Sequence, residues 1–232
     1  MKKIYYLLSL IVLLGTAVSC EKESEGLSRI THFIEIDLEG PATVAVPLGS
    51  DYQEPGYAAM EGENDVTESV EVESNVDNSE IGVYEVSYTA INGDGFPSTK
   101  TRTVVVYDPT APDVDFSGTY STTIIRTESD GSNPREYTAQ MTLTMQGTGV
   151  YYVNCLLGGT YSLYYGYGPA YAMTGYVSLN SDYTLSLITS HVQGWGDSLE
   201  GFQNGVYDTE TGNVYWESIY AGADTYAVTG IK

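Results

Sequence analysis

Hydrophobic and polar positions alternate with a period of two through the first half of the chain, which is typical of strands with one buried face. The alternation is clearest from Ile34 to Glu39, where apolar and acidic residues take turns, and it returns in runs at 44–48, 70–73, 84–88 and 101–107. Clusters rich in Gly, Asn and Asp separate the runs, as turns between strands do. About seven short strands at this spacing predict a β-sandwich over residues 30–108.

Residues 115–232 show no helical period and again alternate strand-like runs with turn signals. Hairpin turns are expected at 130–134 and 209–213. Such strands with short links predict an antiparallel meander, either closed into a barrel without exposed edges or left as an open sandwich. Eight or nine strands are expected, over 118–127, 137–145, 150–156, 160–165, 175–179, 184–189, 201–207, 214–220 and 225–231.

Two prolines, Pro109 and Pro112, mark a break between these parts, because each fixes φ and removes a backbone donor. Composition changes at the same place. Residues 21–112 hold 19 acidic and 4 basic residues, whereas residues 113–232 hold 12 and 3, with 15 of the 22 tyrosines. We therefore predict an all-β chain with a sandwich at 30–108, a linker at 109–114 and a tyrosine-rich domain at 115–232.

The first residues follow a different pattern. Lys2 and Lys3 precede an apolar run from Ile4 to Val18, which is shorter than the ~20 residues of a membrane-spanning helix, and small residues then lead to Cys20. This layout resembles a bacterial lipoprotein signal, with Ala17 where leucine is usual. It implies a cleaved signal at 1–19, lipidation of Cys20 as the membrane anchor, and an acidic tether at 20–29. An uncleaved transmembrane anchor is the alternative.

The residues after the cysteine, 21–26, are polar and acidic. They resemble the surface-export signal of lipoproteins in the Bacteroidota group, which implies an outer-membrane lipoprotein exposed at the cell surface. A solvated linker is the plainer interpretation, and the two are compatible.

Charge and cysteine usage narrow the function. Without the signal the chain has 7 basic and 31 acidic residues, a net charge of −24, which repels phosphate backbones and argues against nucleic-acid binding. Cys155 remains without a cysteine partner and is expected to be a small buried hydrophobe. With only His32 and His191 besides, no metal site or cofactor is predicted.

The segment Val46-Pro47-Leu48-Gly49-Ser50-Asp51-Tyr52, followed by Glu54-Pro55-Gly56-Tyr57, resembles the opening of a family of bacterial Ig-like domains, and residues 82–90 and 102–106 fit its closing strands. The resemblance implies a spacer or accessory module without catalytic residues. Tyr84 is expected to form a tyrosine corner and Gly82 to serve a turn. Residues 92–95, Asn-Gly-Asp-Gly, suit either an ordinary hairpin turn or a calcium loop.

Aromatic residues gather in two places of the C-terminal part. Residues 157–171 hold Tyr165, Tyr167 and Tyr171 among glycines, and Trp195 lies between Gln193 and Asp197. Aromatic faces beside amides and carboxylates suit a neutral sugar, whose C–H face stacks on a ring while its hydroxyls bond polar side chains. We therefore predict stacking by Trp195, Tyr165, Tyr167 and Tyr171, with Asp197 and Gln193 for hydroxyl groups. Packing of these rings at a barrel end is the alternative.

These two patches also resemble an uncharacterised C-terminal domain of surface lipoproteins, and the opening Phe116-Ser117-Gly118-Thr119-Tyr120 resembles lipocalin-type barrels. The first resemblance implies a genetic association with outer-membrane glycan-uptake proteins, which are possible partners. The preferred function is therefore non-catalytic glycan binding or accessory work in polysaccharide uptake, with a structural or adhesive module that binds protein partners as the alternative.

A hydrolase is a third interpretation. It would need two carboxylates across the scissile bond, and Asp197 with Glu200 or Glu217 with Asp208 are the possible pairs. A serine hydrolase would use His191, but the sequence has no Gly-x-Ser-x-Gly elbow.

Overall fold

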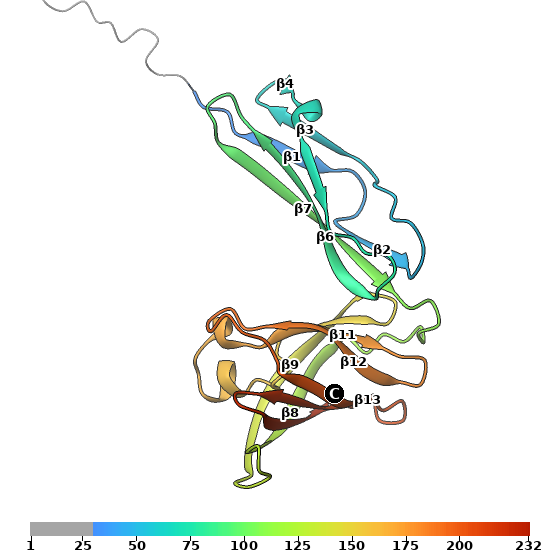
Figure 1. Ribbon diagram of the computed structural model, residues 1–232, viewed down its shortest axis with the longest axis vertical. Coiled ribbons are helices and arrows are strands. Elements are labelled where there is room, and N and C mark those ends of the chain that lie inside the picture. Colours follow the sequence, from blue (N-terminus) through green and yellow to red (C-terminus); the bar gives the residue numbers. More distant parts are fainter. Residues whose placement is uncertain (1–29) are drawn as a thin grey trace, which may run out of the picture.

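The structure, a computed structural model, describes residues 30–232, whose strands form two open sheets followed by a closed barrel (Figure 1). The predicted signal at 1–19, Cys20 and the acidic tether up to residue 29 lie outside the described residues. Within the described residues, no helix is long and apolar enough to cross a membrane.

Two sheets pack face to face in the N-terminal part. One contains β1 (Ile34–Leu38), β3 (Tyr57–Glu61) and β4 (Asn64–Asp65), and the other has the order β2 (Thr43–Pro47), β7 (Pro97–Tyr107), β6 (Gly82–Ile91) and β5 (Glu71–Ser74). All pairings are antiparallel except β2 with β7. Alternate residues of both sheets, such as Ile36, Ala59, Val86 and Val104, form the core between them, so the predicted Ig-like sandwich is confirmed. A 3-10 turn, η1 (Thr67–Ser69), follows β4.

A buried guanidinium crosses the core of this sandwich. The Arg102 side chain is fully buried and donates to the Tyr88 hydroxyl and to the carbonyl oxygens of Glu39 and Gly56, the last two at 2.9 Å. Its Nη2 also lies 3.2 Å from a Glu54 carboxylate oxygen. The buried charge is therefore paired and hydrogen-bonded, as a charge inside a core must be.

Local features expected from the sequence take definite forms. The Tyr84 hydroxyl donates to the carbonyl of Glu80 at 3.0 Å, which makes the expected tyrosine corner. We had expected Gly82 to serve a turn, but the structure places it in a strand. It begins β6, and a Cβ there would come within 2.8 Å of the Tyr84 ring, so the glycine makes room for that ring. Residues 92–95 form the β6–β7 hairpin turn, with the Asn92 side chain accepting from the amides of Asp94 and Phe96.

Eight antiparallel strands of the C-terminal part follow one another around a closed barrel. They are β8 (Gly118–Thr127), β9 (Arg135–Gly147), β10 (Val150–Val153), β11 (Thr174–Leu179), β12 (Thr184–His191), β13 (Gly201–Tyr207), β14 (Val214–Tyr220) and β15 (Asp224–Ile231). The last strand pairs with the first, from Thr225 opposite Thr127 to Ile231 opposite Ser121. The predicted meander is therefore a barrel and not an open sandwich.

The barrel interior is filled with side chains, including Tyr120, Ile124, Met141, Trp216 and Tyr226. One mouth is closed by the β10–β11 connection, in which residues 155–160 are all buried. The carbonyl of Leu156 accepts hydrogen bonds from Trp216 Nε1 and Ser218 Oγ, both at 2.8 Å. The connection therefore acts as a plug that is tied to the inner wall.

The plug corrects one predicted strand. Residues 160–165, expected to be extended, instead form a π-helical turn, η2 (Thr160–Tyr164), and a 3-10 turn, η3 (Pro169–Tyr171), follows. Gly158 and Gly159 precede η2 with φ of 65° and 99°, and a Cβ on Gly158 would lie 2.6 Å from the Ile124 side chain. The left-handed conformation of these glycines turns the chain away from the barrel mouth. The tyrosines that follow have a high strand propensity, but at this place no strand can continue.

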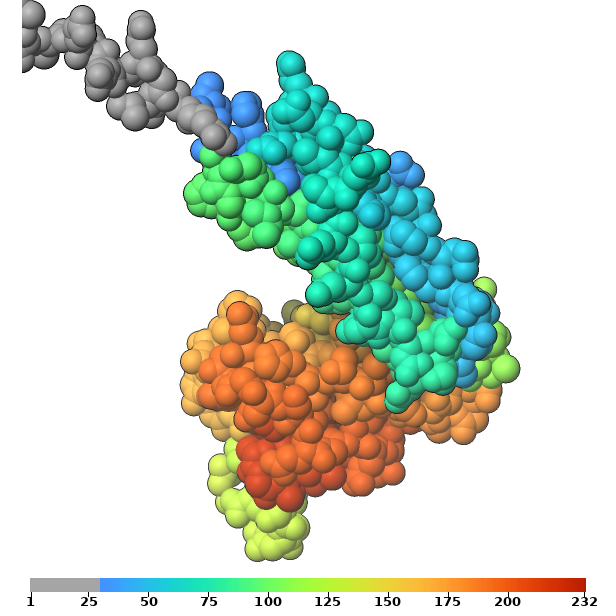
Figure 2. Space-filling model, turned by 45° about the horizontal axis from the view of Figure 1, so that its top comes forward, coloured from blue at the N-terminus to red at the C-terminus, as the bar shows by residue number. Residues whose placement is uncertain are grey.

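The two parts meet at the opposite end of the barrel. There the β9–β10 turn faces the sandwich, since a Cβ on Gly147 would contact Val105 and Ala45 at 3.1 and 3.4 Å. The linker between the parts packs against the barrel. Ala111 is buried, and the Tyr151 hydroxyl donates to the carbonyl of Val114. Figure 2 shows the sandwich and the barrel joined in this region. Residue 30, where the described chain begins, lies beside the β6–β7 turn at the other end of the sandwich, because Asn92 Nδ2 donates to the carbonyl of His32.

Candidate functional site

The plugged mouth of the barrel carries the candidate site. In an antiparallel meander alternate connections share an end, so the connections at 154–173, 192–200 and 221–223 all lie at this mouth, away from the linker. The two aromatic segments are joined there by a hydrogen bond from Gly194 N to the carbonyl of Ala170, at 2.7 Å. A Cβ on Gly194 would lie 2.6 Å from the Tyr171 ring, so only glycine permits this approach.

The structure brings all four predicted stacking residues into one group. Trp195 meets Tyr171 edge to face at 4.9 Å between ring centroids, Tyr167 meets Tyr171 at 5.7 Å, and Tyr165 stacks on Tyr167 at 5.8 Å. Two further rings complete it. We call the group of Tyr161, Tyr165, Tyr167, Tyr171, Trp195 and Tyr220 the aromatic cluster.

The outer rings of the aromatic cluster face solvent. Trp195 is 42% exposed, Tyr165 39% and Tyr167 53%, whereas Tyr220 is buried beneath the indole at a centroid distance of 6.3 Å. Aromatic rings usually bury most of their area, so three large rings held together in the open are the main feature of this surface. The lower rings therefore pack at the barrel end, whereas the upper ones remain accessible to solvent.

Polar groups flank the rings. The carboxylate of Asp197 accepts from the Tyr220 hydroxyl, with its two oxygens at 2.9 and 3.1 Å, and the Asp197 carbonyl accepts from Val192 N at 2.9 Å. Burial and the neighbouring Asp197 raise the pKa of Tyr220, so its hydroxyl stays a donor at neutral pH. Gln193 is exposed on the same loop as Trp195, as a contact for sugar hydroxyls requires.

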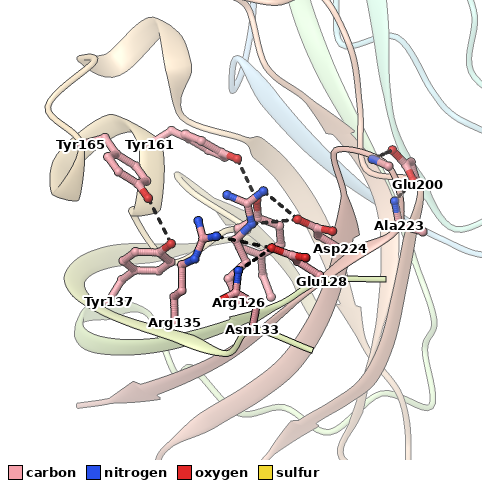
Figure 3. A network of polar contacts seen from close by, with 12 residues as sticks. Arg126, Glu128, Asn133, Arg135, Tyr137, Tyr161, Tyr165, Glu200, Ala223 and Asp224 are labelled. Atoms are coloured by element: carbon pink, nitrogen blue, oxygen red, sulfur yellow. Dashed lines mark hydrogen bonds and ion pairs between the residues drawn. The ribbon is translucent and has the colours of Figure 1, made fainter. Parts of the chain in front are cut away.

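Below the rings lies a charged pair that the sequence analysis missed. Arg126 donates to one oxygen of Asp224 from Nε at 2.9 Å and Nη2 at 2.6 Å, and its guanidinium lies 5.4 Å from the Tyr226 ring centroid. The hydroxyls of Tyr226 and Tyr161 are 2.7 Å apart. Figure 3 shows the pair beneath Tyr161, with the Tyr165 hydroxyl turned toward Tyr137. The floor of the aromatic cluster is therefore a connected polar network.

The carboxylate pairs considered for hydrolysis are used in other ways. Glu200 accepts from the amides of Gly222 and Ala223, which fixes the β14–β15 turn. Hydrogen bonds from Tyr215, Gln203 and Asn204 lower the pKa of Glu217, and those of the Thr211 hydroxyl and nearby amides lower the pKa of Asp208. A general acid needs a raised pKa, so neither suits that role.

The remaining candidates have structural roles or lie at the surface. Cys155 is buried in the plug, and burial raises the pKa of its thiol, which agrees with the expected small hydrophobe. His191 is exposed at the end of β12. Among residues 30–232, no group of three or more His, Cys, Asp and Glu side chains is arranged to hold a metal ion.

Comparison with known proteins assigns both parts of the chain. The model described as a bacterial surface protein Ig-like domain matches residues 36–106, and a model described as a C-terminal domain matches residues 108–232. The crystal structure of the lipoprotein BT2262 from Bacteroides thetaiotaomicron is 35% identical, covering 86% of this chain and all of that one, with a TM-score of 0.47. The chain belongs to the family of this lipoprotein.

Both predicted resemblances are thereby confirmed: the chain has a surface Ig-like domain followed by the C-terminal domain of a lipoprotein family. The family and the surface Ig-like domain indicate a protein of the bacterial cell envelope. No curated protein sequence matches the chain.

Two further solved structures have lower identity and cover less of the chain. One, from Clostridium perfringens ZmpB, contains CBM51-2 in complex with GlcNAc and INT domains; it is 18% identical, covers 52% of this chain and 29% of that one, and has a TM-score of 0.28. A second, from the same protein, contains the M60 catalytic domain with CBM51-1 and CBM51-2; it is 19% identical, covers 52% and 14%, and has the same TM-score.

Proposed function

We propose that this lipoprotein-family member is a non-catalytic glycan-binding protein of the outer-membrane surface, accessory to polysaccharide uptake. The convergence of Trp195, Tyr165, Tyr167 and Tyr171 carries the proposal, because exposed rings held by two joined loops offer stacking faces to a sugar. Asp197, bonded to Tyr220 beneath the indole, and Gln193, exposed on the same loop as Trp195, supply groups that can bond sugar hydroxyls.

The placement of the aromatic cluster supports display at a surface. The described chain starts at one end of the sandwich, whereas the aromatic cluster lies at the barrel mouth away from the linker. A lipid on Cys20, as the signal pattern implies, would attach the start of the sandwich to the membrane and leave the rings of the barrel exposed to solvent. The strongly acidic chain favours neutral or cationic glycans over polyanions.

The test is affinity electrophoresis of residues 21–232 in gels that contain amylopectin, xyloglucan, galactomannan or yeast mannan. We expect retardation by at least one of these glycans, and loss of retardation in Trp195→Ala. Phe96→Ala is the matched control, because it removes an exposed ring from the β6–β7 turn of the sandwich and leaves the aromatic cluster intact.

Retardation by none of the glycans would contradict the proposal. It would favour the alternative, binding of a protein partner through the same face, where Leu163 and Tyr164 add exposed apolar area. Capture of a defined surface protein by the parent chain but not by Trp195→Ala would then support that alternative.

A further inference from the structure

Two hollows on the outer wall of the barrel lie next to the aromatic cluster. The first, about 350 Å³, is bounded by β9, β10 and β11 and roofed by the η2–η3 loop. The second, about 440 Å³, lies over β8, β9 and β15. Gln140 and Leu163 line both hollows, so they adjoin across β9. Each has a volume in the lower part of the range for small-ligand sites.

The chemistry of these hollows is unusual for this chain. None of the described residues that line them is charged, although the protein carries 31 acidic residues. By contrast, three hollows on the sandwich each contain at least one acidic residue, such as Glu73, Asp37 or Glu35. The barrel hollows instead present amides and hydroxyls, from Gln140, Asn154, Thr174, Ser121, Thr123 and Thr138.

Apolar groups complete the lining. Tyr152 and Pro169 border the first hollow, and Leu163, which is 57% exposed, stands between the two. Uncharged hydrogen-bonding groups together with flat apolar ones match the two kinds of surface on a neutral sugar ring. Charged ligands would find no partner for their charge among these side chains.

The loop that roofs the first hollow also carries four tyrosines of the aromatic cluster, Tyr161, Tyr165, Tyr167 and Tyr171. Gly168 and Pro169 line the hollow, while Tyr167 and Tyr171 on either side of them belong to the aromatic cluster. The π-helical turn starts directly against β9, since a Cβ on Gly159 would lie 2.8 Å from Ala139 and 2.9 Å from the Gln140 carbonyl. The same Cβ would lie 3.4 Å from Leu163, so this close approach also places Leu163 over β9. Stand-alone π-helical turns are rare, and π-helical geometry is frequent at functional sites.

We infer that the two hollows form one groove that binds the continuation of a neutral glycan chain whose first units stack on the aromatic cluster. This inference rests on the proposed function and specifies its ligand as an uncharged oligosaccharide of several units, bound along the barrel wall. Gln140, at the junction of the hollows, donates to and accepts from hydroxyl groups, and Leu163 contacts an apolar sugar face.

The test compares a disaccharide and a hexasaccharide prepared from whichever neutral polysaccharide retards the parent chain, with dissociation constants measured by calorimetry. We expect the hexasaccharide to bind more tightly than the disaccharide. Gln140→Ala and Leu163→Ala should each weaken hexasaccharide binding about five-fold and leave disaccharide binding unchanged. Both side chains are exposed, so the fold should tolerate the changes. Gln146→Ala is the matched control on the same strand, outside both hollows.

The outcomes separate the inference from the proposed function. If Trp195→Ala abolishes binding while Gln140→Ala and Leu163→Ala bind both ligands like the parent, the inferred binding in the groove is refuted. Stacking on the aromatic cluster is then supported. If the groove variants lose hexasaccharide affinity while Trp195→Ala does not, glycan binding in the groove is supported. The proposed stacking on the aromatic cluster is then refuted. If no glycan binds the parent chain, both are overturned.

Discussion

The hydroxyl of Tyr220, on the inner face of β14, donates to the carboxylate of Asp197 on the loop that carries Trp195, with the two oxygens at 2.9 and 3.1 Å. This contact joins the rigid barrel wall to the exposed loop. Since the Tyr220 ring also lies beneath the Trp195 indole, one side chain fixes both a stacking face and a neighbouring polar group. Side chains held in this way would lose little conformational freedom on binding the proposed glycan.

Tyr220→Phe is therefore expected to reduce both stability and glycan binding. The ring packing is kept, but the lost hydrogen bond should lower the free energy of unfolding by about 1 kcal/mol, and glycan affinity should fall because Asp197 is no longer fixed. Urea denaturation and affinity electrophoresis measure the two effects.

Tyr215→Phe is the control for Tyr220→Phe. Tyr215 lies on the same strand as Tyr220, and its hydroxyl donates to Glu217 at 2.7 Å, away from the aromatic cluster. It should lose similar stability and keep its glycan affinity. Equal affinities for both variants would show that the Tyr220–Asp197 bond does not shape the site.

The sequence predicted most of the fold because its patterns are local. Eight of the nine runs proposed in the C-terminal part are strands of the barrel, since alternation and turn residues mark each strand. The run 160–165 was wrong, because the plug and the glycines at 158 and 159 decide its conformation, and those are tertiary effects. The aromatic residues were also found locally, in two glycine-rich segments, and their convergence needed only that both segments connect strands at one mouth.

The sequence did not reveal the contacts of Arg126, Asp224 and Arg102, because these contacts form between segments far apart in the chain. Arg126 and Asp224 share the parity of buried neighbours such as Ile124 and Tyr226, so alternation places both on the inner face of the barrel. Their contact follows only once β15 pairs with β8, which sets Tyr226 opposite Arg126. Nothing in the spacing of residues so far apart in sequence indicates that pairing. The same holds for Arg102, whose partners at Glu39, Glu54 and Gly56 come from other strands and loops.

Gly194→Ala tests whether the two aromatic segments must stay joined. The added methyl group would lie 2.6 Å from the Tyr171 ring and 3.0 Å from the Ala170 carbonyl, so the loops should separate and glycan affinity should fall at least ten-fold. Gly196→Ala is the control: its φ of 76° makes alanine strained by about 1 kcal/mol, but a Cβ there meets no atom within 4 Å. Electrophoretic retardation of Gly194→Ala equal to that of Gly196→Ala would refute the requirement.

Arg102→Met should destabilise the sandwich without affecting the aromatic cluster. The substitution keeps most of the side-chain length but removes the buried guanidinium that donates to the carbonyls of Glu39 and Gly56 and pairs with the Glu54 carboxylate, at a cost of about 3 kcal/mol. Thermal unfolding followed by circular dichroism should therefore show an earlier transition. Glycan retardation below that transition should match the parent chain, and its loss would mean that the sandwich takes part in binding.

The tyrosines of the barrel make stability sensitive to alkaline pH. Burial raises the pKa of Tyr120 from 10.0 to about 12, and burial with the Glu217 hydrogen bond does the same for Tyr215. Above pH 10 the unfolded chain loses these protons while the folded barrel keeps them, so the free energy of unfolding falls as pH rises through this window. Each such tyrosine contributes a slope of about 1.4 kcal/mol per pH unit, and the stabilisation is fully present below pH 10.

Urea denaturation of the parent chain and of Tyr120→Phe at about pH 9 and about pH 11 measures that slope. At the lower pH the variant should be less stable by about 1–3 kcal/mol, because the buried Phe116 carbonyl loses the hydroxyl that donates to it at 2.6 Å. Between the two pH values the variant should lose less stability than the parent, since one tyrosine whose pKa is raised by folding has been removed. Parallel pH dependences would mean that Tyr120 ionises as readily in the folded barrel as in the unfolded chain, contrary to its burial in the core.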